Sequence, residues 1–139
     1  MSREPASSER PSHEADCLFC NFSRDADRVT ERSVHFFARL DSFPVSRGHT
    51  LIISNRHVLS PFDLREDEWC DFHQILAGVY DDIEAEYSPD GYNVGINVGS
   101  AGGQTVAHLH IHVIPRYEGD VRDPAGGVRK IVPNLVSYP

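Results

Sequence analysis

Four segments of the chain have the pattern of β-strands: in three of them apolar and polar residues alternate with a period of two, and the fourth, TLIIS, is a short β-branched run after Gly48. The first of these segments, SVHFFARL, places Val34, Phe36 and Ala38 on one side of the strand. The last segment is followed by Pro115, which has no backbone N–H to donate, so we expect the strand to end there. The four predicted strands are 33–40, 50–54, 92–98 and 106–114.

One segment between the second and third predicted strands has the periodicity of an amphipathic helix instead. Residues 63–66 (DLRE) have the spacing of a capping box, so we expect the helix to begin there. Its expected apolar stripe consists of Trp69, Phe72, Leu76, Val79 and Ile83. The helix residues expected to face solvent are Asp71, Asp81, Asp82 and Glu86. Strands in runs with one long helix predict an α+β fold with a mainly antiparallel sheet.

Length and composition predict one globular domain. The chain has 139 residues, of which 40% are hydrophobic and 24% are charged. Residues 1–15 lack apolar periodicity, so we expect a flexible tail followed by a single domain over 16–139. We find neither a membrane-spanning stretch nor the apolar core of a signal sequence, and therefore expect a soluble, cytoplasmic protein without a membrane partner. The net charge of −8 argues against a nucleic-acid polymer as partner, whereas a free nucleotide is compatible with it.

Three histidines at every second position, His108, His110 and His112, are the strongest chemical signal in the sequence. On a strand their side chains lie on one face about 6.5–7 Å apart, while the apolar residues between them enter the core. We therefore predict that the three imidazoles share one site; the alternative is a polar strand facing solvent. The preceding loop, NVGSAGGQT, has small residues that let backbone N–H groups approach an anion, with Gln104 and Thr105 as further donors. The alternative for this loop is a plain connection between two strands.

The cysteines do not predict a disulfide framework, because three is an odd number. Cys17 and Cys20 are separated by two residues, which is the spacing of half a tetrahedral zinc site, but spacing alone does not identify the other two ligands. A redox pair is less favoured because no βαβ pattern surrounds it, and two buried cysteines without metal are the remaining alternative. Cys70, in the predicted helix, is expected to fill the core. Ordinary surface or core positions are expected for His13, His35 and His73.

The sequence GGQTVAHLHIHVIPR resembles the signature of the histidine triad (HIT) family of nucleotide hydrolases and transferases. The segments DSFPVSRGHTLIISNRH and CLFC are similar to further parts of the zinc-containing prokaryotic-type branch, so the resemblance spans Cys17 to Arg116. It implies a HIT-like α+β fold with about five strands, one long helix and a short helix. It also implies a homodimer that cleaves a purine nucleotide derivative at the α-phosphate. The implied substrate is a dinucleoside polyphosphate or a nucleoside phosphoramidate.

The resemblance also implies the catalytic residues. His110 would be the nucleophile that forms a covalent nucleotidyl-histidine, with one ring nitrogen held by the backbone carbonyl of His108. The other residues of the implied catalytic set would stabilise the phosphoryl oxygens, assist the leaving group or support the geometry of the histidine cluster. The implied catalytic set is His110, His112, His49, Gln104 and Thr105.

A nucleotide site and a zinc site follow from the same resemblance. The implied nucleotide-binding residues are Leu18, Phe19, Asp41, Asn97, Gly103, Gln104, Thr105, His110 and His112. The implied ligands of a structural Zn²⁺ are Cys17, Cys20, His57 and His108, by similarity to zinc-containing family members and to the related galactose-phosphate uridylyltransferases. Arg39 departs from the family pattern, because this position is often apolar and lines the base pocket, so the resemblance does not identify the preferred base.

Two other functions are compatible with these residues. One is a nucleotide-binding, zinc-stapled interaction module with little turnover, although such a module has no need of a nucleophilic His110. The other is a hydrolase in which the three histidines hold a catalytic metal ion.

Overall fold

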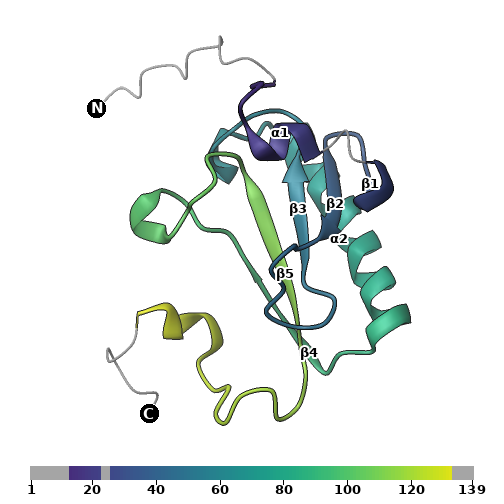
Figure 1. Ribbon diagram of the computed structural model, residues 1–139, viewed down its shortest axis with the longest axis vertical. Coiled ribbons are helices and arrows are strands. Elements are labelled where there is room, and N and C mark those ends of the chain that lie inside the picture. Colours follow the sequence, from purple (N-terminus) through teal and green to yellow (C-terminus); the bar gives the residue numbers. More distant parts are fainter. Residues whose placement is uncertain (1–12, 23–25, 133–139) are drawn as a thin grey trace.

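A computed structural model of the protein describes residues 13–22 and 26–132. Its centre is a five-stranded sheet in the order β1-β2-β3-β5-β4, in which every neighbouring pair is antiparallel. The strands are β1 Val29–Arg32, β2 Phe36–Leu40, β3 Thr50–Ser54, β4 Gly91–Gly95 and β5 His110–Arg116. The helices are α1 Leu18–Phe22 and α2 Glu66–Tyr87, with 3-10 turns η1 Ala26–Arg28, η2 Pro61–Asp63, η3 Ser100–Gly102 and η4 Gly127–Ile131. The predicted α+β fold with five strands, one long helix and one short helix is therefore confirmed (Figure 1).

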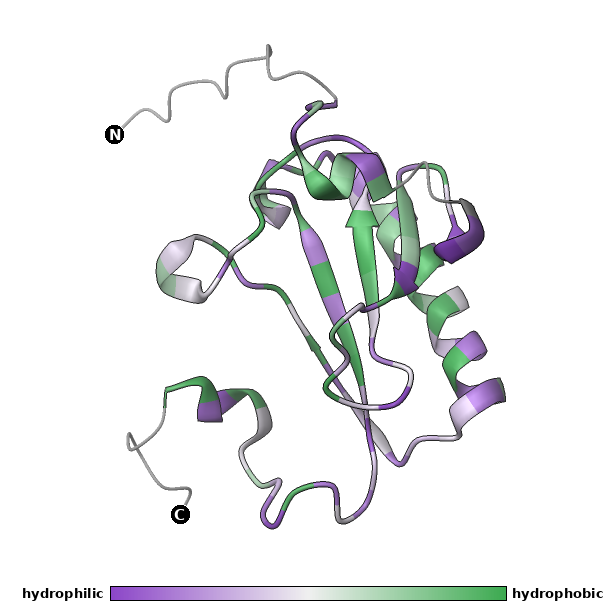
Figure 2. Cartoon of the chain, viewed as in Figure 1, coloured by the Kyte–Doolittle hydropathy of each residue, from purple (hydrophilic) through white to green (hydrophobic). Residues whose placement is uncertain are grey.

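The sheet is buried on both faces over its central strands. On one face, α2 packs against a core of Phe36, Ala38, Ile52, Val58, Ile75, Val79, Ile83, Leu109, Ile111 and Val113. On the other face, α1 contributes Phe19 to a smaller cluster with Phe37, Leu51 and Ile53. This second cluster explains why nearly every residue of β2 and β3 is buried, instead of every second one. Along β5, in contrast, apolar and polar residues alternate (Figure 2).

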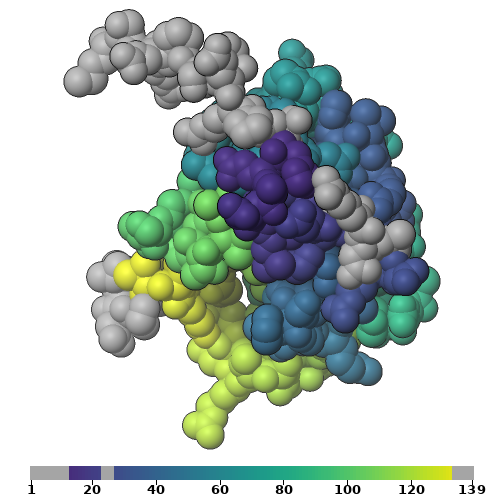
Figure 3. All heavy atoms as spheres, turned by 45° about the horizontal axis from the view of Figure 1, so that its top comes forward, coloured from purple at the N-terminus to yellow at the C-terminus, as the bar shows by residue number. Residues whose placement is uncertain are grey.

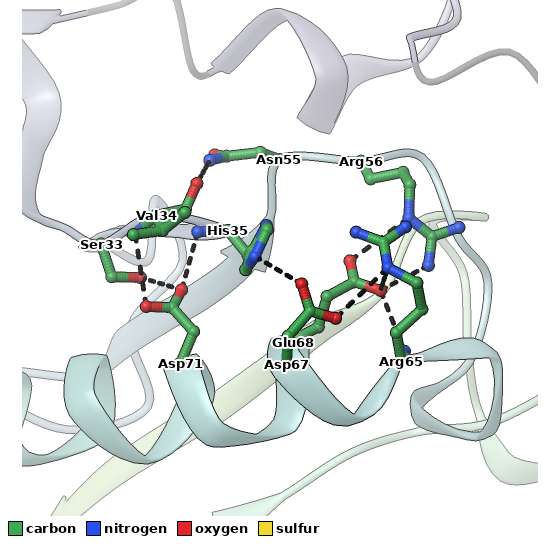
Figure 4. Close-up of polar contacts among 9 residues, drawn as sticks. All are labelled: Ser33, Val34, His35, Asn55, Arg56, Arg65, Asp67, Glu68 and Asp71. Carbon is green, nitrogen blue, oxygen red and sulfur yellow. Dashed lines mark hydrogen bonds and ion pairs between the residues drawn. The ribbon is translucent and has the colours of Figure 1, made fainter.

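The predicted strand 33–40 begins too early. The structure places Ser33–His35 in a turn, and Val34 is 77% exposed instead of sharing the core face with Phe36. The cause is Asp71 of α2, whose carboxylate accepts hydrogen bonds from Ser33 Oγ at 2.7 Å, Val34 N at 3.3 Å and His35 N at 2.7 Å (Figure 4). The prediction that Asp71 faces solvent is therefore wrong, since its carboxylate caps the backbone of this turn.

Helix α2 begins after the predicted capping box, with Arg65 as its N-cap residue. The Glu68 side chain accepts a hydrogen bond from Arg65 N at 3.0 Å, so the reciprocal cap lies two residues later than expected. The buried stripe contains Ile75, which is 2% exposed, whereas Trp69 at the predicted stripe position is 43% exposed. Cys70 is exposed as well, so the prediction that it fills the core is wrong. The expected solvent positions of Asp81, Asp82 and Glu86 are confirmed.

Strand β5 includes Pro115, contrary to the expectation that this residue ends the strand. Pro115 lies opposite Tyr92 of β4, while the pairing of β3 with β5 ends at Val113. On the β3 side, the Pro115 carbonyl accepts a hydrogen bond from Ser46 Oγ at 2.6 Å, so the missing N–H breaks no ladder bond there. Strand β5 also starts at His110, not at the predicted residue 106. Strand β4 ends at Gly95, before the predicted end at residue 98.

The expected N-terminal tail lies mostly outside the described residues, because residues 1–12 are not among them. Glu14, at the end of that tail, already contacts the domain, since its backbone N–H donates to Cys20 Sγ at 3.3 Å. Residues 133–139 of the expected domain are also outside the described part. Across residues 13–22 and 26–132, no helix combines the length and apolarity needed to cross a bilayer.

Candidate active site and metal centre

Strand β5 separates its apolar and histidine side chains onto opposite faces of the sheet. Leu109, Ile111 and Val113 are at most 2% exposed and belong to the core beneath α2, as predicted. His110 lies opposite Ile53 of β3, and His112 lies opposite Leu51. Both imidazoles therefore emerge on the α1 face of the sheet.

His110 is held in one tautomer by the backbone. Its Nδ1 lies 2.8 Å from the carbonyl oxygen of His108, which can only accept a hydrogen bond, so Nδ1 carries the proton. Nε2 consequently keeps its lone pair. The ring is 7% exposed and meets the edge of Phe19, with 4.8 Å between ring centroids and an interplanar angle of 85°. These contacts fix the orientation of an imidazole with one nucleophilic nitrogen.

His112 belongs to a second hydrogen-bonded chain. The backbone N–H of Val45 donates to His49 Nδ1 at 3.1 Å, so the His49 proton resides on Nε2. This Nε2 lies 2.9 Å from His112 Nδ1 and 3.4 Å from Asp41 Oδ2. His112 Nδ1 therefore accepts, and its own proton lies on Nε2, where it is a hydrogen-bond donor. Burial lowers the pKa of His49 although Asp41 opposes the shift, and burial together with the neighbouring histidines lowers the pKa of His112.

His108 does not join the other two histidines, so the prediction that all three imidazoles share one site is wrong. Its ring is fully buried, and Nδ1 lies 3.3 Å from Cys17 Sγ and 3.4 Å from Cys20 Sγ. His108 precedes β5 in a bend, and its Nε2 is held 2.7 Å from the carbonyl oxygen of Ser54. Only its backbone carbonyl reaches His110. Among the described residues, no cluster of metal-ligating groups contains all three histidines, which removes the basis for a catalytic metal held by them.

Cys17, Cys20, His57 and His108 form a cluster that could hold a metal ion. One ligand atom from each residue lies within 4.8 Å of all the others, and His57 Nδ1 is 3.3 Å from Cys20 Sγ. Tetrahedral zinc with its usual bond lengths separates a sulfur and a nitrogen ligand by about 3.6 Å, so the three sulfur–nitrogen distances of 3.3–3.4 Å fit a zinc site. The other ring nitrogens have outer partners, Ser54 O for His108 and the Glu14 carboxylate at 3.5 Å for His57. This arrangement leaves both Nδ1 atoms available as ligands.

The His57 side of the cluster is anchored to α2. Glu68, 1% exposed, accepts hydrogen bonds from Arg56 Nε at 3.2 Å and Arg56 Nη2 at 2.6 Å (Figure 4). The neighbouring Asn55 donates through its backbone N–H to His35 O at 2.8 Å. Because these bonds hold the two residues before His57, the loop that carries it is connected both to α2 and to the turn before β2.

A cavity of about 380 Å³ opens beside His110 and His112. The cavity is lined by residues of the N-terminal segment, of β2 with the segment after it, and of the segment that leads into β5, which Figure 3 shows in purple, blue and green. Eight of the nine residues expected to bind nucleotide line this cavity: Leu18, Phe19, Asp41, Asn97, Gly103, Thr105, His110 and His112. Arg39, at the position that lines the base pocket in the family, lines it as well, and the residues that the sequence did not assign to it are Phe22, Ser42, Phe43, Leu51 and Val106. Phe22 could have been found, because it lies within one helical turn of Leu18 and Phe19.

Two expected site residues, His49 and Gln104, do not line the cavity; His49 reaches it through His112, and Gln104 has backbone partners. For Gln104 these partners are in two loops. Its side-chain oxygen accepts from Gly99 N at 3.0 Å, and its Nε2 donates to Leu59 O at 2.9 Å. The amide therefore ties the glycine-containing loop to the segment after His57. A larger cavity of about 620 Å³, next to the C-terminal half of α2, has no histidine or cysteine in its lining.

Comparisons with known proteins agree with this geometry. The family model of the HIT domain matches residues 24–119, which include all four histidines at positions 49, 108, 110 and 112. An uncharacterised HIT-like protein of Methanocaldococcus jannaschii is 37% identical over 108 residues, covering 75% of this chain and 81% of that protein. An AP-4-A phosphorylase of Mycobacterium tuberculosis is 32% identical over 139 residues, covering 98% of this chain and 70% of that enzyme. The crystal structure of a Zn-bound histidine triad family protein from Mycobacterium smegmatis is similar with a TM-score of 0.67 and 34% identity, covering 78% and 84% of the two chains.

Proposed function

The chain belongs to the HIT family, and from this premise we propose that it is a nucleotide hydrolase or transferase acting through a covalent nucleotidyl-histidine. The substrate would be a purine nucleotide derivative, either a dinucleoside polyphosphate or a nucleoside phosphoramidate, cleaved at the α-phosphate. The observation that carries the proposal is the 2.8 Å hydrogen bond between His110 Nδ1 and the His108 carbonyl. It leaves a nucleophilic Nε2 on a ring that borders the 380 Å³ cavity.

In the first step, the Nε2 lone pair of His110 attacks the α-phosphorus. A nitrogen–phosphorus bond forms, and the bond from phosphorus to the leaving group breaks, so the leaving group departs with that electron pair. It takes a proton from solvent through the Thr105 hydroxyl, which borders the cavity. The nucleotidylated imidazole is cationic, and the His108 carbonyl stabilises it through the hydrogen bond at Nδ1. In the second step, water attacks phosphorus and forms an oxygen–phosphorus bond while the bond from phosphorus to Nε2 breaks. Its electron pair returns to Nε2, which regenerates neutral His110, and the proton from water goes to solvent.

The developing negative charge on the phosphoryl oxygens needs hydrogen-bond donors in place before the reaction. His112 supplies one such donor, its Nε2–H. The hydrogen bonds from Val45 to His49 and from His49 to His112 place the His112 proton on this nitrogen. Asn97 and Gly103 border the same cavity from the glycine-containing loop. Gln104 would contribute by holding that loop, since both ends of its amide bond to backbone groups.

The nucleoside would extend from this phosphoryl position toward α1. Asp41 is suited to the ribose hydroxyls, because its carboxylate accepts hydrogen bonds and lies 4.0 Å from His112 Nδ1. Leu18 and Phe19 would contact the base through apolar and aromatic surface. An extended ligand in this direction would place its phosphorus beside the two histidines and its base against the short helix.

We also propose that Cys17, Cys20, His57 and His108 bind Zn²⁺, for which the donor set and the outer hydrogen bonds fit. The ion would be structural: it would connect the segment before α1 to His108, whose carbonyl orients the nucleophile. A homodimer is proposed from the family resemblance. The edge strand β4, which pairs with β5 on one side, offers backbone groups for such an assembly.

The test is to incubate the protein with an α-labelled adenine or guanine nucleotide substrate and to quantify acid-labile label on the protein. The wild type and a His73→Ala control should both acquire label, because His73 is an exposed histidine on α2. His110→Ala should acquire none, and labelling that survives this substitution would refute the nucleophile. Saturable nucleotide binding without label or product in the wild type would instead identify a binding module with little turnover.

A further inference from the structure

A second cavity, with a volume of about 340 Å³, adjoins the candidate active site at His112. It is lined by residues of β4, of β5 beyond His112 and of the 3-10 turn η4, and we call it the η4 cavity. His112 and Asn97 line both this cavity and the one that borders His110. The residues proposed to contact the nucleoside, Asp41, Leu18 and Phe19, line only the first cavity. The two cavities therefore lie on either side of the proposed phosphoryl position.

The geometry of β5 directs a leaving group into the η4 cavity. His110, His112 and Ile114 alternate onto one face of the strand, about 6.5–7 Å apart. In a phosphoryl transfer, the attacking atom and the leaving group lie roughly in line on opposite sides of phosphorus. With His110 as the attacking residue and phosphorus beside His112, the leaving group would extend along β5 over Ile114. The space beside this path is open, because Gly95 lies opposite His112 and a Cβ added to it would meet no atom within 4 Å.

The lining of the η4 cavity is largely apolar and uncharged. Its apolar residues are Val45, Val94, Ile114, Val128 and Ile131. Among the residues that the structure describes, those that line this cavity include no lysine, arginine, aspartate or glutamate. Burial lowers the pKa of His49 and of His112, so both imidazoles are neutral at pH 7. Val128 is 56% exposed and Ile131 is 84% exposed, so a ligand here would remove apolar surface from water.

We infer that the η4 cavity binds the leaving group and that this group is an amine with an apolar chain, which makes a nucleoside phosphoramidate the preferred substrate over a dinucleoside polyphosphate. The inference rests on the proposed function for His110 as the attacking residue. In the transfer, the bond from phosphorus to the amine nitrogen breaks, and the nitrogen keeps the electron pair and takes one proton from solvent. The apolar chain on that nitrogen would cover Val128 and Ile131.

A polyphosphate leaving group is a poorer fit for the η4 cavity. Its first phosphate is linked to the α-phosphorus by a single oxygen, so this charged group would lie in the uncharged cavity without a cationic partner. A third cavity, of about 420 Å³, is lined by Arg47 and Arg116. Arg116 is four residues beyond His112, or about 13 Å along an extended strand. Its guanidinium already donates to Asp120 at 2.7 and 2.8 Å and to Asn93 Oδ1 at 2.7 Å. Both arginines therefore lie beyond the position that the first phosphate would take.

The test compares adenosine phosphoramidates of ethylamine and butylamine, two amines of nearly equal basicity. The measured quantity is kcat/KM, which includes the departure of the amine and not the later hydrolysis of the nucleotidyl-histidine. The wild type should favour the butyl compound by roughly 5- to 15-fold, because each fully buried methylene contributes about fourfold. The phosphoramidate of 4-aminobutyrate, whose chain ends in a carboxylate, should react at least about tenfold more slowly than the butyl compound. Diadenosine tetraphosphate should also have a lower kcat/KM than the butyl compound.

Two matched substitutions locate this preference. Val128→Ser removes part of the apolar wall and should lower the ratio of butyl to ethyl by roughly two- to threefold. Val34→Ser, at an exposed valine that lines neither cavity, should leave the ratio as in the wild type. Thermal unfolding checks that both variants are folded. A wild-type ratio near one, an unchanged ratio in folded Val128→Ser, or a higher kcat/KM for the tetraphosphate would overturn the inference.

A second copy of the chain is the competing occupant of this apolar surface. In that case the wild-type ratio would be near one and Val128→Ser would weaken self-association in analytical ultracentrifugation, which would overturn the inference. A failure of the proposed function is distinguishable, because titration calorimetry measures binding of the intact phosphoramidates without turnover. Tighter binding of the butyl compound, dependent on Val128, would then support the cavity although no label reached the protein. Equal binding of the two compounds would overturn the inference alone, and absence of binding of either would overturn both.

Discussion

Glu68 connects α2 to the loop that carries His57, and its replacement tests how the proposed metal site is supported. The carboxylate is 1% exposed and accepts three hydrogen bonds, at 3.2 and 2.6 Å from Arg56 and at 3.0 Å from the backbone of Arg65 (Figure 4). Glu68→Gln keeps the shape of the side chain and removes its charge. The amide also presents a donor where the carboxylate presents an acceptor, so it cannot reproduce both bonds to Arg56.

The expected loss of stability is about 2–3 kcal/mol at pH 7. Removing one partner of a fully buried ion pair costs about 3–5 kcal/mol, because the other charge is left unpaired in the interior. The Arg56 side chain is 33% exposed, so water partly compensates its guanidinium and the cost falls below that range. For a domain of 139 residues, this loss should lower Tm by roughly 6–12 °C.

The effect should depend on pH with a definite sign. Burial alone would raise the pKa of Glu68, but hydrogen bonds from Arg56 and the Arg65 backbone lower it below its ordinary value of 4.5. A carboxyl group with a lowered folded pKa stabilises the protein fully above its unfolded pKa, and this contribution is lost as the pH falls through the folded pKa. The difference between the wild type and Glu68→Gln should therefore be full at pH 7 and shrink below about pH 4.

Urea unfolding of both proteins at pH 7 and at lower pH provides the measurement, with Asp81→Asn as the control. Asp81 is an exposed acid on the same helix, so its substitution should change the free energy of unfolding by less than about 0.5 kcal/mol. If Glu68→Gln unfolds at the same urea concentration as Asp81→Asn, Glu68 does not anchor the loop. A difference between Glu68→Gln and the wild type that persists undiminished in acid would refute the contribution of the ionised carboxylate.

Three further substitutions test the metal site, the core and the catalytic cluster. Cys20→Ser should abolish the binding of one zinc per chain, measured by mass spectrometry of the purified protein, whereas Cys70→Ser at an exposed position should retain it; equal zinc in both proteins would reject the ligand assignment. Ile75→Ala should lower the free energy of unfolding by about 2–5 kcal/mol, because Ile75 is 2% exposed, and a loss as small as that of the exposed Gln74→Ala would contradict its place in the core. His112→Ala should reduce kcat by roughly 10²- to 10³-fold in a steady-state assay, and a rate within threefold of the wild type would exclude it as the donor to the phosphoryl oxygens.

The predicted elements that agree with the structure depend on local regularities. The long helix is recognisable from its apolar spacing, although its start depends on Glu68 and Arg65 rather than on residues 63–66. Residues 63–66 and 65–68 both place a glutamate three residues after a polar residue, and the hydrogen bonds from Arg56 to the buried Glu68 favour the second pair. The prediction that a strand begins at Ser33 is wrong for a similar reason. The residues near Val34 in the sequence do not indicate that the carboxylate of Asp71, 37 residues away, accepts a hydrogen bond from its backbone.

Gln104 illustrates the same limit within the candidate site. An amide after two glycines suggests a donor to an anion, and the loop sequence is compatible with that role. In the folded chain, its Nε2 instead donates to the carbonyl of Leu59, which is 45 residues distant. Local sequence identifies the hydrogen-bonding capacity of a side chain, whereas packing decides which partner uses that capacity.

The sequence by itself determined that His110 and His112 share a face of β5 opposite Leu109 and Ile111, because side chains alternate along any extended backbone. The family resemblance implied His108 as a partner of Cys17, but the strand pattern placed its ring in the row of the other two histidines, and only the tertiary structure decided that it leaves this row for Cys17, 91 residues away in the chain. The physical reason is that alternation is a property of a few consecutive peptide units, while a contact between distant residues depends on how the strands and the short helix pack together. The strand pattern supplies the proposed nucleophile His110, and the fold supplies the His108 carbonyl that holds its ring and the buried cluster that holds His108.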